Sequence, residues 1–151
     1  MQIIEWNILT DLQRNAIIAE KVMGWKWIEH LEKGELWLLP DKLSTTEVSS
    51  GDTVWYIKEE EVWPEGNVSP LPHKDKRSVP YWLPHYTTHM DAAWDIVDRI
   101  NTNFILTRTD TGTCFGHFSG GEPRVHTFAE TPQIVICIDA LRLLGYEVKD
   151  R

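Results

Sequence analysis

A chain of 151 residues, with 42% hydrophobic and 25% charged side chains, has the balance of one globular domain. The formal net charge of −8 argues against nucleic acid as the main partner, because phosphate contacts need clustered lysine and arginine. The apolar runs are far shorter than the roughly 20 residues that a membrane span needs, and the N-terminus lacks the pattern of a signal peptide. We therefore predict a single domain over residues 1–151 that is cytoplasmic and has no membrane partner.

Two alternatives are compatible with residues 2–6, a short edge strand or a loosely packed segment, and a helix is predicted after them. Thr10 and Gln13 have the spacing of a capping box, in which each residue satisfies a backbone N–H of the other. Gly24 has the position of a left-handed helix cap. This pattern predicts a helix from Thr10 to about Gly24.

Three strands are predicted next. Alternation of apolar and charged residues begins at residues 25–28, and an apolar run occupies residues 35–39. Residues 53–58 (TVWYIK) are rich in β-branched and aromatic side chains, which favour strands. Residues 44–52 are polar and rich in turn formers, so we predict an exposed loop there.

Five prolines fall between residues 63 and 84. Proline lacks the N–H that helices and central strands require. Residues 59–86 are therefore predicted to form one long extended loop, of the kind that often carries function.

A central amphipathic helix is predicted within residues 84–101 (PHYTTHMDAAWDIVDRIN). Thr87 or Thr88 has the residue type of an N-cap. The predicted buried face of the helix consists of Met90, Ala93, Trp94, Val97 and Ile100.

Three strands and a second helix complete the pattern. Strands are predicted at residues 103–108, 113–118 and 124–128, with a hairpin turn at residues 110–112 between the first two. Gly116 lies inside a strand pattern, where glycine indicates a bulge or a close backbone approach.

The final helix is predicted to begin at Thr131 and Pro132 and to end at Gly145. Its β-branched run at residues 134–138 prefers strand, but the caps at both ends favour helix. The predicted buried face is Ile134, Cys137, Ile138, Leu141 and Leu144.

Three of these segments resemble the phage ABA sandwich domain family. They are AEKVMGW at residues 19–25, PHYTTHMDAAWDIV at residues 84–97, and AETPQIVICIDALRLLG at residues 129–145. The resemblance implies an α+β fold, a helix/sheet/helix sandwich with a mainly antiparallel sheet, encoded by a phage or prophage. It transfers no catalytic residue, cofactor or metal.

Two histidine pairs are candidates for a metal site or an acid–base group. His85 and His89 are four residues apart, but the predicted cap lies between them, so they are not expected to share a helix face. His117 and His126 could face each other across adjacent strands. Neither pair has the carboxylate or cysteine partners of a zinc site, and we predict no metal.

The two cysteines do not indicate a thiol nucleophile. Cys114 lies in the middle of a predicted strand and Cys137 in the middle of a predicted helix, whereas activated cysteines sit at helix N-termini or beside cations. The glycine-rich phosphate loops of nucleotide enzymes are also missing from the sequence. We therefore predict a protein that is not an enzyme and needs no cofactor.

A ligand site is predicted where aromatic and basic residues meet the start of the central helix. Aromatic faces can stack on a base, and a helix N-terminus is a ready anion site. The predicted ligand-binding residues are Arg77, Trp82, Tyr86, Thr87, Thr88 and Arg124. The alternative is that the loop folds back and its tryptophans only cover a sheet.

Three functions are compatible with this pattern. The first is sequestration of a cyclic nucleotide or a ligand of the cyclic ADP-ribose type, which would blunt a host anti-phage defence. The second is a protein-binding inhibitor or accessory phage protein that acts on a host or phage partner. The third is a degenerate nucleotide hydrolase that uses His117 and His126. A homo-oligomer is compatible with each of them.

Overall fold

The computed structural model describes residues 2–30, 35–40, 45–49, 53–57, 68–70, 77–80, 82–121 and 123–151. The chain divides into two compact units. Unit 1 consists of Met1–Ile18 and Pro84–Arg151, and unit 2 consists of Ala19–Leu83. The single domain expected over residues 1–151 stays a prediction.

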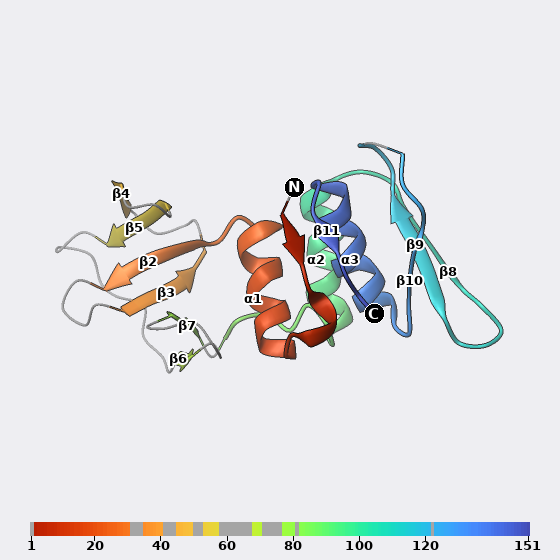
Figure 1. Ribbon diagram of the computed structural model, residues 1–151, viewed down its shortest axis with the longest axis horizontal. Helices are drawn as coiled ribbons and strands as arrows, with labels where there is room; N and C mark the ends of the chain where they lie inside the picture. Colours follow the sequence, from red (N-terminus) through yellow and green to blue (C-terminus); the bar gives the residue numbers. More distant parts are fainter. Residues whose placement is uncertain are drawn as a thin grey trace. The chain divides into compact units, whose positions relative to one another are not determined.

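Unit 1 is built around a helix–strand–strand–strand–helix sequence, as predicted. Its elements are β1 (Ile3–Ile4), η1 (Trp6–Ile8), most of α1 (Asp11–Lys21), α2 (Met90–Ile100), β8 (Phe104–Arg108), β9 (Cys114–Phe118), β10 (Thr127–Ala129), α3 (Pro132–Leu143) and β11 (Glu147–Val148). Strand β1 pairs with β11 in parallel, so the strand alternative for residues 2–6 is confirmed. Helix α3 packs on β9, β10, β11 and α2 (Figure 1).

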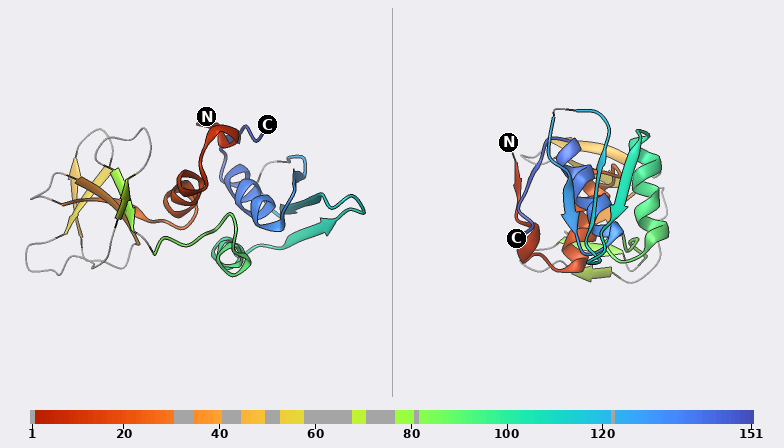
Figure 2. Two further views of the ribbon diagram at one scale, coloured as in Figure 1. Left: turned by 90° about the horizontal axis from the view of Figure 1, so that it is seen from below. Right: turned by 90° about the vertical axis from the view of Figure 1, so that its right-hand side faces the viewer.

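Three antiparallel strands form the sheet of unit 1, in the order β10-β9-β8 (Figure 2). The predicted hairpin turn joins β8 to β9, and its Gly112 has φ +87°. Gly116 of β9 is the close approach that the sequence predicted. A Cβ atom there would lie 2.5 Å from the Ile105 carbonyl oxygen and 3.1 Å from Val135 Cγ1 of α3.

Helix α3 is the core of unit 1. The Thr131 hydroxyl accepts from the Ile134 N–H at 3.4 Å and Pro132 is the first helical residue, so the predicted cap is confirmed. All seven residues from Val135 to Leu141 are buried. The predicted buried stripe was therefore too narrow, and Leu144, placed on it, is 50% exposed. Because α3 is covered on every side in this stretch, burial of the β-branched run outweighs its preference for strand.

Helix α1 begins as the sequence predicts. The Thr10 hydroxyl accepts from the Gln13 N–H at 3.2 Å, and the Gln13 side chain accepts from the Thr10 N–H at 2.8 Å. This reciprocal pair is a capping box. After the helix, Gly24 has φ +78°, which is favourable for glycine.

Helix α2 differs from its prediction at two points. Its N-cap is His89, without a side-chain cap bond, rather than Thr87 or Thr88. The Thr87 hydroxyl instead donates to Asn15 Oδ1. The buried residues are Ala92, Ala93 and Ile96, whereas Met90 and Trp94 of the predicted stripe are 36% and 51% exposed. The stripe is rotated because small alanines, not the tryptophan, fit the close contact with α3.

Unit 2 contains a six-stranded sheet in the order β4-β5-β2-β3-β7-β6. The strands are β2 (Lys26–His30), β3 (Glu35–Leu39), β4 (Thr45–Ser49), β5 (Thr53–Ile57), β6 (Val68–Pro70) and β7 (Arg77–Pro80). Strands β2, β3 and β5 confirm the three predicted strands. The β2/β5 and β3/β7 pairs are parallel and the others antiparallel.

Two predicted loops contain strands. Strand β4 lies within the predicted loop at residues 44–52 and pairs antiparallel with β5, which its two threonines and valine favour. Strands β6 and β7 lie within the proline-rich range 59–86, and β7 is not an edge strand, because it pairs with both β3 and β6. The prediction that this range excludes a central strand was wrong. The prolines of the two strands stand at strand ends, where a missing N–H is tolerated.

The acidic run at residues 59–61 and the basic residues at 74 and 76 lie outside the described residues. Within the described part of the chain, no helix has the length and apolar character to cross a bilayer.

Candidate functional site

Two of the predicted ligand-binding residues belong to unit 2, and both contact tryptophans there. The Arg77 guanidinium lies 5.0 Å from the centroid of the Trp27 ring, a cation–π distance. The Trp82 ring lies 5.6 Å from the Trp25 ring and is 38% exposed. Trp82 therefore presents part of an aromatic surface to solvent.

Tyr86 and Thr87 belong to unit 1 and are core residues. Tyr86 is 2% and Thr87 3% exposed. Burial, with smaller effects from Asp95 and Cys137, raises the pKa of the Tyr86 phenol well above its ordinary value. The Thr87 N–H and hydroxyl both donate to Asn15 Oδ1, at 3.1 and 3.0 Å. These groups are directed into the protein.

Thr88 is exposed, and its carbonyl oxygen accepts from Gln133 at 3.4 Å. Arg124 is held by the protein itself. Its guanidinium donates to the carbonyl oxygens of Phe118 and Gly120, at 2.6 and 2.9 Å, and forms an ion pair with Asp139 at 2.9 Å. The six predicted residues are thus divided between the units, and those of unit 1 serve mostly in its core.

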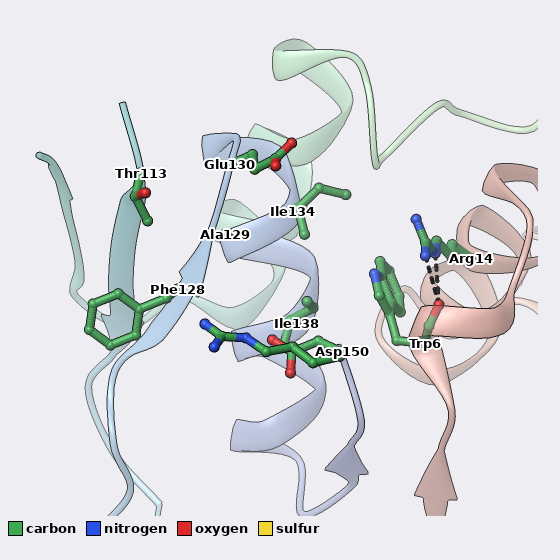
Figure 3. A pocket seen from close by; sticks show the side chains of 10 residues that line it. Trp6, Arg14, Thr113, Phe128, Ala129, Glu130, Ile134, Ile138 and Asp150 are labelled. Atoms are coloured by element: carbon green, nitrogen blue, oxygen red, sulfur yellow. Dashed lines mark hydrogen bonds between the residues drawn. The ribbon is translucent and has the colours of Figure 1, made fainter. Parts of the chain in front are cut away.

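A cavity of about 400 Å³ lies wholly within unit 1 (Figure 3). It is lined by residues of η1, α1, β10 and α3, and by the segments before β9, before α3 and after β11. The lining residues are Trp6, Arg14, Thr113, Phe128, Ala129, Glu130, Ile134, Ile138, Asp150 and Arg151. We call this cavity the unit 1 pocket.

One wall of the unit 1 pocket is an arginine stacked on a tryptophan. The Arg14 guanidinium lies 5.2 Å from the centroid of the Trp6 ring and donates twice to the Trp6 carbonyl oxygen, at 3.0 and 2.8 Å (Figure 3). The Asp11 carboxylate forms an ion pair with the Arg14 guanidinium at 3.7 Å. Arg14 is therefore positioned before any ligand arrives, which reduces the entropy lost on binding.

The other charged residues of the pocket come from the segment before α3 and from the C-terminal segment. Glu130 and Arg151 are exposed, and Asp150 is 3.5 Å from Arg142. The Lys149 N–H donates to the Ile4 carbonyl oxygen at 2.9 Å, which fixes this segment beside β1. The pocket thus offers both cations and carboxylates.

A family model described as the phage ABA sandwich domain matches residues 16–141. The chain belongs to the phage ABA sandwich domain family. The family and the α+β fold predicted from the sequence are confirmed, and the chain is a phage protein with an ABA sandwich domain.

Among solved structures, a phage protein from Bacillus cereus ATCC 14579 is similar to this ABA sandwich chain. It is 21% identical, the match covers 93% of both chains, and the TM-score is 0.49. A comparison with curated proteins found no match.

The unit 1 pocket of this ABA sandwich chain was not predicted from the sequence. Trp6 and Arg14 come from the first residues, whereas Phe128 and Arg151 come from the last quarter of the chain. No local spacing links them. The only signal in the sequence is its content of eight tryptophans, which does not single out Trp6.

Two histidine pairs are close together. The rings of His117 and His126 are 4.9 Å apart, as the predicted strand pairing suggested. The rings of His85 and His89 are also 4.9 Å apart, contrary to prediction. The His89 N–H donates to the His85 carbonyl oxygen at 2.9 Å, a helical bond that brings residues four apart to one side. Within the described residues, no group of three or more metal-ligating side chains occurs.

Proposed function

We propose that this chain is a non-enzymatic binding protein that sequesters a nucleotide-derived immune signal in the host cytoplasm. The ligand is of the cyclic nucleotide or cyclic ADP-ribose type, and its capture counters anti-phage defence. The observation that supports the proposal is the unit 1 pocket, with its aromatic and cationic walls, in a phage protein.

The pocket has a suitable size and lining for such a ligand. Small-molecule sites in proteins occupy about 300–1,000 Å³, with apolar walls and a few polar groups that fix orientation. The Phe128 ring is 46% exposed and supplies aromatic surface, and base–aromatic stacking is worth roughly 1–3 kcal/mol per base. Ile134 and Ile138 extend the apolar wall.

The charges of the pocket fit a ligand that carries both phosphates and hydroxyl or amino groups. Arg14 and Arg151 can pair with phosphate oxygens, which guanidinium groups bind in a bidentate manner. Glu130 and Asp150 can accept hydrogen bonds from ribose hydroxyls or an exocyclic amine. A ligand with negative charge alone would meet repulsion from these carboxylates.

The mechanism is mass action. A sequestering protein must bind the signal more tightly than the host effector does and must be present in at least equal amount. It returns the ligand chemically unchanged.

The test is a thermal-shift and tryptophan-fluorescence titration with cyclic dinucleotides, cyclic ADP-ribose isomers and ordinary nucleotides. A ligand at 100 times its dissociation constant should raise the free energy of unfolding by about 2.7 kcal/mol. Recovery of the intact ligand after denaturation supports sequestration, whereas recovery of an altered ligand identifies an enzyme. If no member of the panel produces a shift, the proposal is overturned.

Matched variants locate the site. Phe128→Ala and Arg151→Gln should each weaken binding at least tenfold, because each removes a lining group of the pocket. Ile105→Ala and Arg108→Gln change exposed residues of β8 outside the pocket lining and should leave the affinity unchanged.

Arg77 and Trp82 of unit 2 stay a second candidate contact for the same ligand class. Trp82 is partly exposed beside Trp25, and stacking there would change its fluorescence. Loss of binding in Trp82→Ala with normal binding in Phe128→Ala would move the site to unit 2.

A protein partner is the alternative function, and one observation favours it. On the sheet of unit 1, the large apolar residues Ile105 and Phe128 are 61% and 46% exposed. Exposed apolar groups of this size commonly mark interaction surfaces. Stoichiometric capture of one host or phage protein without nucleotide, lost in Ile105→Ser, would favour this function.

A further inference from the structure

His117 and His126 are cross-strand neighbours on the sheet of unit 1. His117 lies in β9, and His126 immediately precedes β10. Gly116 is opposite Thr127 in the antiparallel register, so the next pair outward is His117 and His126. Their ring centroids are 4.9 Å apart with the rings nearly perpendicular. Such pairs are the closest side-chain neighbours that a sheet offers.

The distance between the rings suits shared coordination of one ion. Imidazole nitrogens bind zinc at about 2.0–2.1 Å, so two histidines on one tetrahedral ion have ring centroids roughly 5 Å apart. The observed separation of 4.9 Å is close to this value, and the nearly perpendicular rings need to rotate so that one nitrogen of each faces the ion.

A second observation at the same place is an unsatisfied nitrogen. His117 Nδ1 is buried and has no hydrogen-bond partner among the described residues. Buried polar atoms are nearly always paired with protein, water or an ion, so an unpaired one calls for an explanation. The surroundings are apolar: Ile105 is opposite His117 in the register, and the Phe115 ring is 5.8 Å from the His126 ring.

We propose that His117 and His126 bind a divalent late transition-metal ion, Zn²⁺ or Cu²⁺. Imidazole is a preferred ligand of both ions. Two protein ligands leave the other coordination positions to water, which makes the ion exchangeable rather than structural. This inference departs from the expectation of no metal, which rested on the lack of carboxylate and cysteine partners.

The other histidine pair is a weaker candidate at the same distance. His85 and His89 are both exposed and lie at the N-terminus of α2, where the partial positive charge of the helix opposes a cation. Because both side chains are exposed, water can satisfy their nitrogens, and no buried unsatisfied nitrogen is found there within the described residues. The experiment therefore uses the full chain with His85→Ala and His89→Ala as its background.

Binding of Zn²⁺ is measured by isothermal titration calorimetry, and binding of Cu²⁺ by electron paramagnetic resonance. In the background chain we expect one ion per chain, with nitrogen hyperfine structure from two imidazoles. His117→Phe and His126→Phe keep an aromatic ring but remove the nitrogens. Each should weaken binding at least about tenfold, while circular dichroism reports the same fold.

Equal affinity in the background chain and in the His117→Phe/His126→Phe double variant would overturn the proposal. Absence of binding in the background chain would do the same. A readout that does not depend on the phenylalanine variants is paramagnetic broadening by substoichiometric Cu²⁺. Loss of the His117 and His126 ring signals before those of other histidines supports the site, and any other order contradicts it.

Discussion

Asp139 is the residue that joins the sheet of unit 1 to α3. It is fully buried in the middle of the helix. One carboxylate oxygen accepts from the Phe118 N–H at 2.7 Å and from Arg124 at 2.9 Å, and the other accepts from the Thr127 hydroxyl at 2.9 Å. A buried carboxylate is tolerable only with such complete pairing.

Asp139→Asn should destabilise the protein strongly. Loss of the charge leaves the mostly buried Arg124 guanidinium without its counter-ion, and breaking one partner of a buried pair costs roughly 3–5 kcal/mol. Urea unfolding followed by circular dichroism measures the loss. Asp98→Asn, which changes an exposed aspartate of α2, should stay within about 0.5 kcal/mol of the parent chain. Equal stabilities for the two variants would contradict the role assigned to Asp139.

Tyr86 should make the protein sensitive to alkali. Burial raises the pKa of its phenol in the folded state, whereas the unfolded chain ionises near the ordinary value of 10.0. The unfolded state therefore loses the proton first, and the stability due to Tyr86 is present below pH 10 and falls as the pH rises above it.

The slope from one such group is about 1.4 kcal/mol per pH unit. In Tyr86→Phe, the free energy of unfolding should fall less steeply above pH 10 than in the parent chain. Cys137, whose thiol pKa is also raised by burial, should give a separate decline that begins near its ordinary value of 9.0. Parallel curves for Tyr86→Phe and the parent chain would rule out this effect of Tyr86.

Residue roles could be predicted from the sequence only where the partners are local. Thr10 and Gln13 are three residues apart, and their spacing alone predicted the capping box. Asp139 was missed because its partners are on other elements, and a lone aspartate in an apolar helix has no local signature. Tyr86 was assigned to a ligand for its aromatic ring and Thr87 for its place at the start of a helix. Both side chains are buried, and burial is a non-local property that the sequence did not reveal.

At the scale of elements, the contact between β8, β9 and α3 depends on Gly116. Its φ is not in the left-handed region, so the need for glycine comes from space rather than from backbone conformation. Gly116→Ala should cost more than 2 kcal/mol, roughly the range of an overpacked core, because the added methyl meets the Ile105 backbone and Val135.

Gly112→Ala is the matched control in the adjacent turn. The site has open space but a φ of +87°, so only the backbone penalty of about 1 kcal/mol applies. Chemical denaturation of both variants gives the comparison. A larger loss of unfolding free energy in Gly112→Ala than in Gly116→Ala would contradict the role given to Gly116.

Whole elements were predicted well where periodicity and caps agree. The bounds of β3 are those of the predicted run, and α3 begins at the predicted cap. Errors occurred where strand pairing overrode composition: β4 pairs with the next strand, β5, and β7 pairs with β3, which is distant in the sequence. The unit 1 pocket could not be predicted, because its lining comes from four helices and strands and from three segments outside them.

At the scale of the whole molecule, the division into two units has a measurable consequence. Residues of one unit make most of their contacts with each other. A destabilising substitution should therefore lower the local stability of its own unit and leave that of the other unchanged. In Asp139→Asn, amide hydrogen exchange should accelerate in β9 and α3. Amides of β2 and β3 should exchange at the rate of the parent chain, as nuclear magnetic resonance can measure. Uniform acceleration in both units would mean that the chain unfolds as one cooperative body.

Unit 1 is built from two separate stretches of the chain, and this affects how the protein folds during synthesis. Met1–Ile18 belongs to unit 1, yet the rest of that unit begins at Pro84. On the ribosome, Ile3 and Ile4 emerge long before Glu147 and Val148, the residues with which they pair. Unit 2 is contiguous and can fold during synthesis, whereas the N-terminal segment must wait for its partner strand. The unit that contains the pocket is thus the later of the two to be completed.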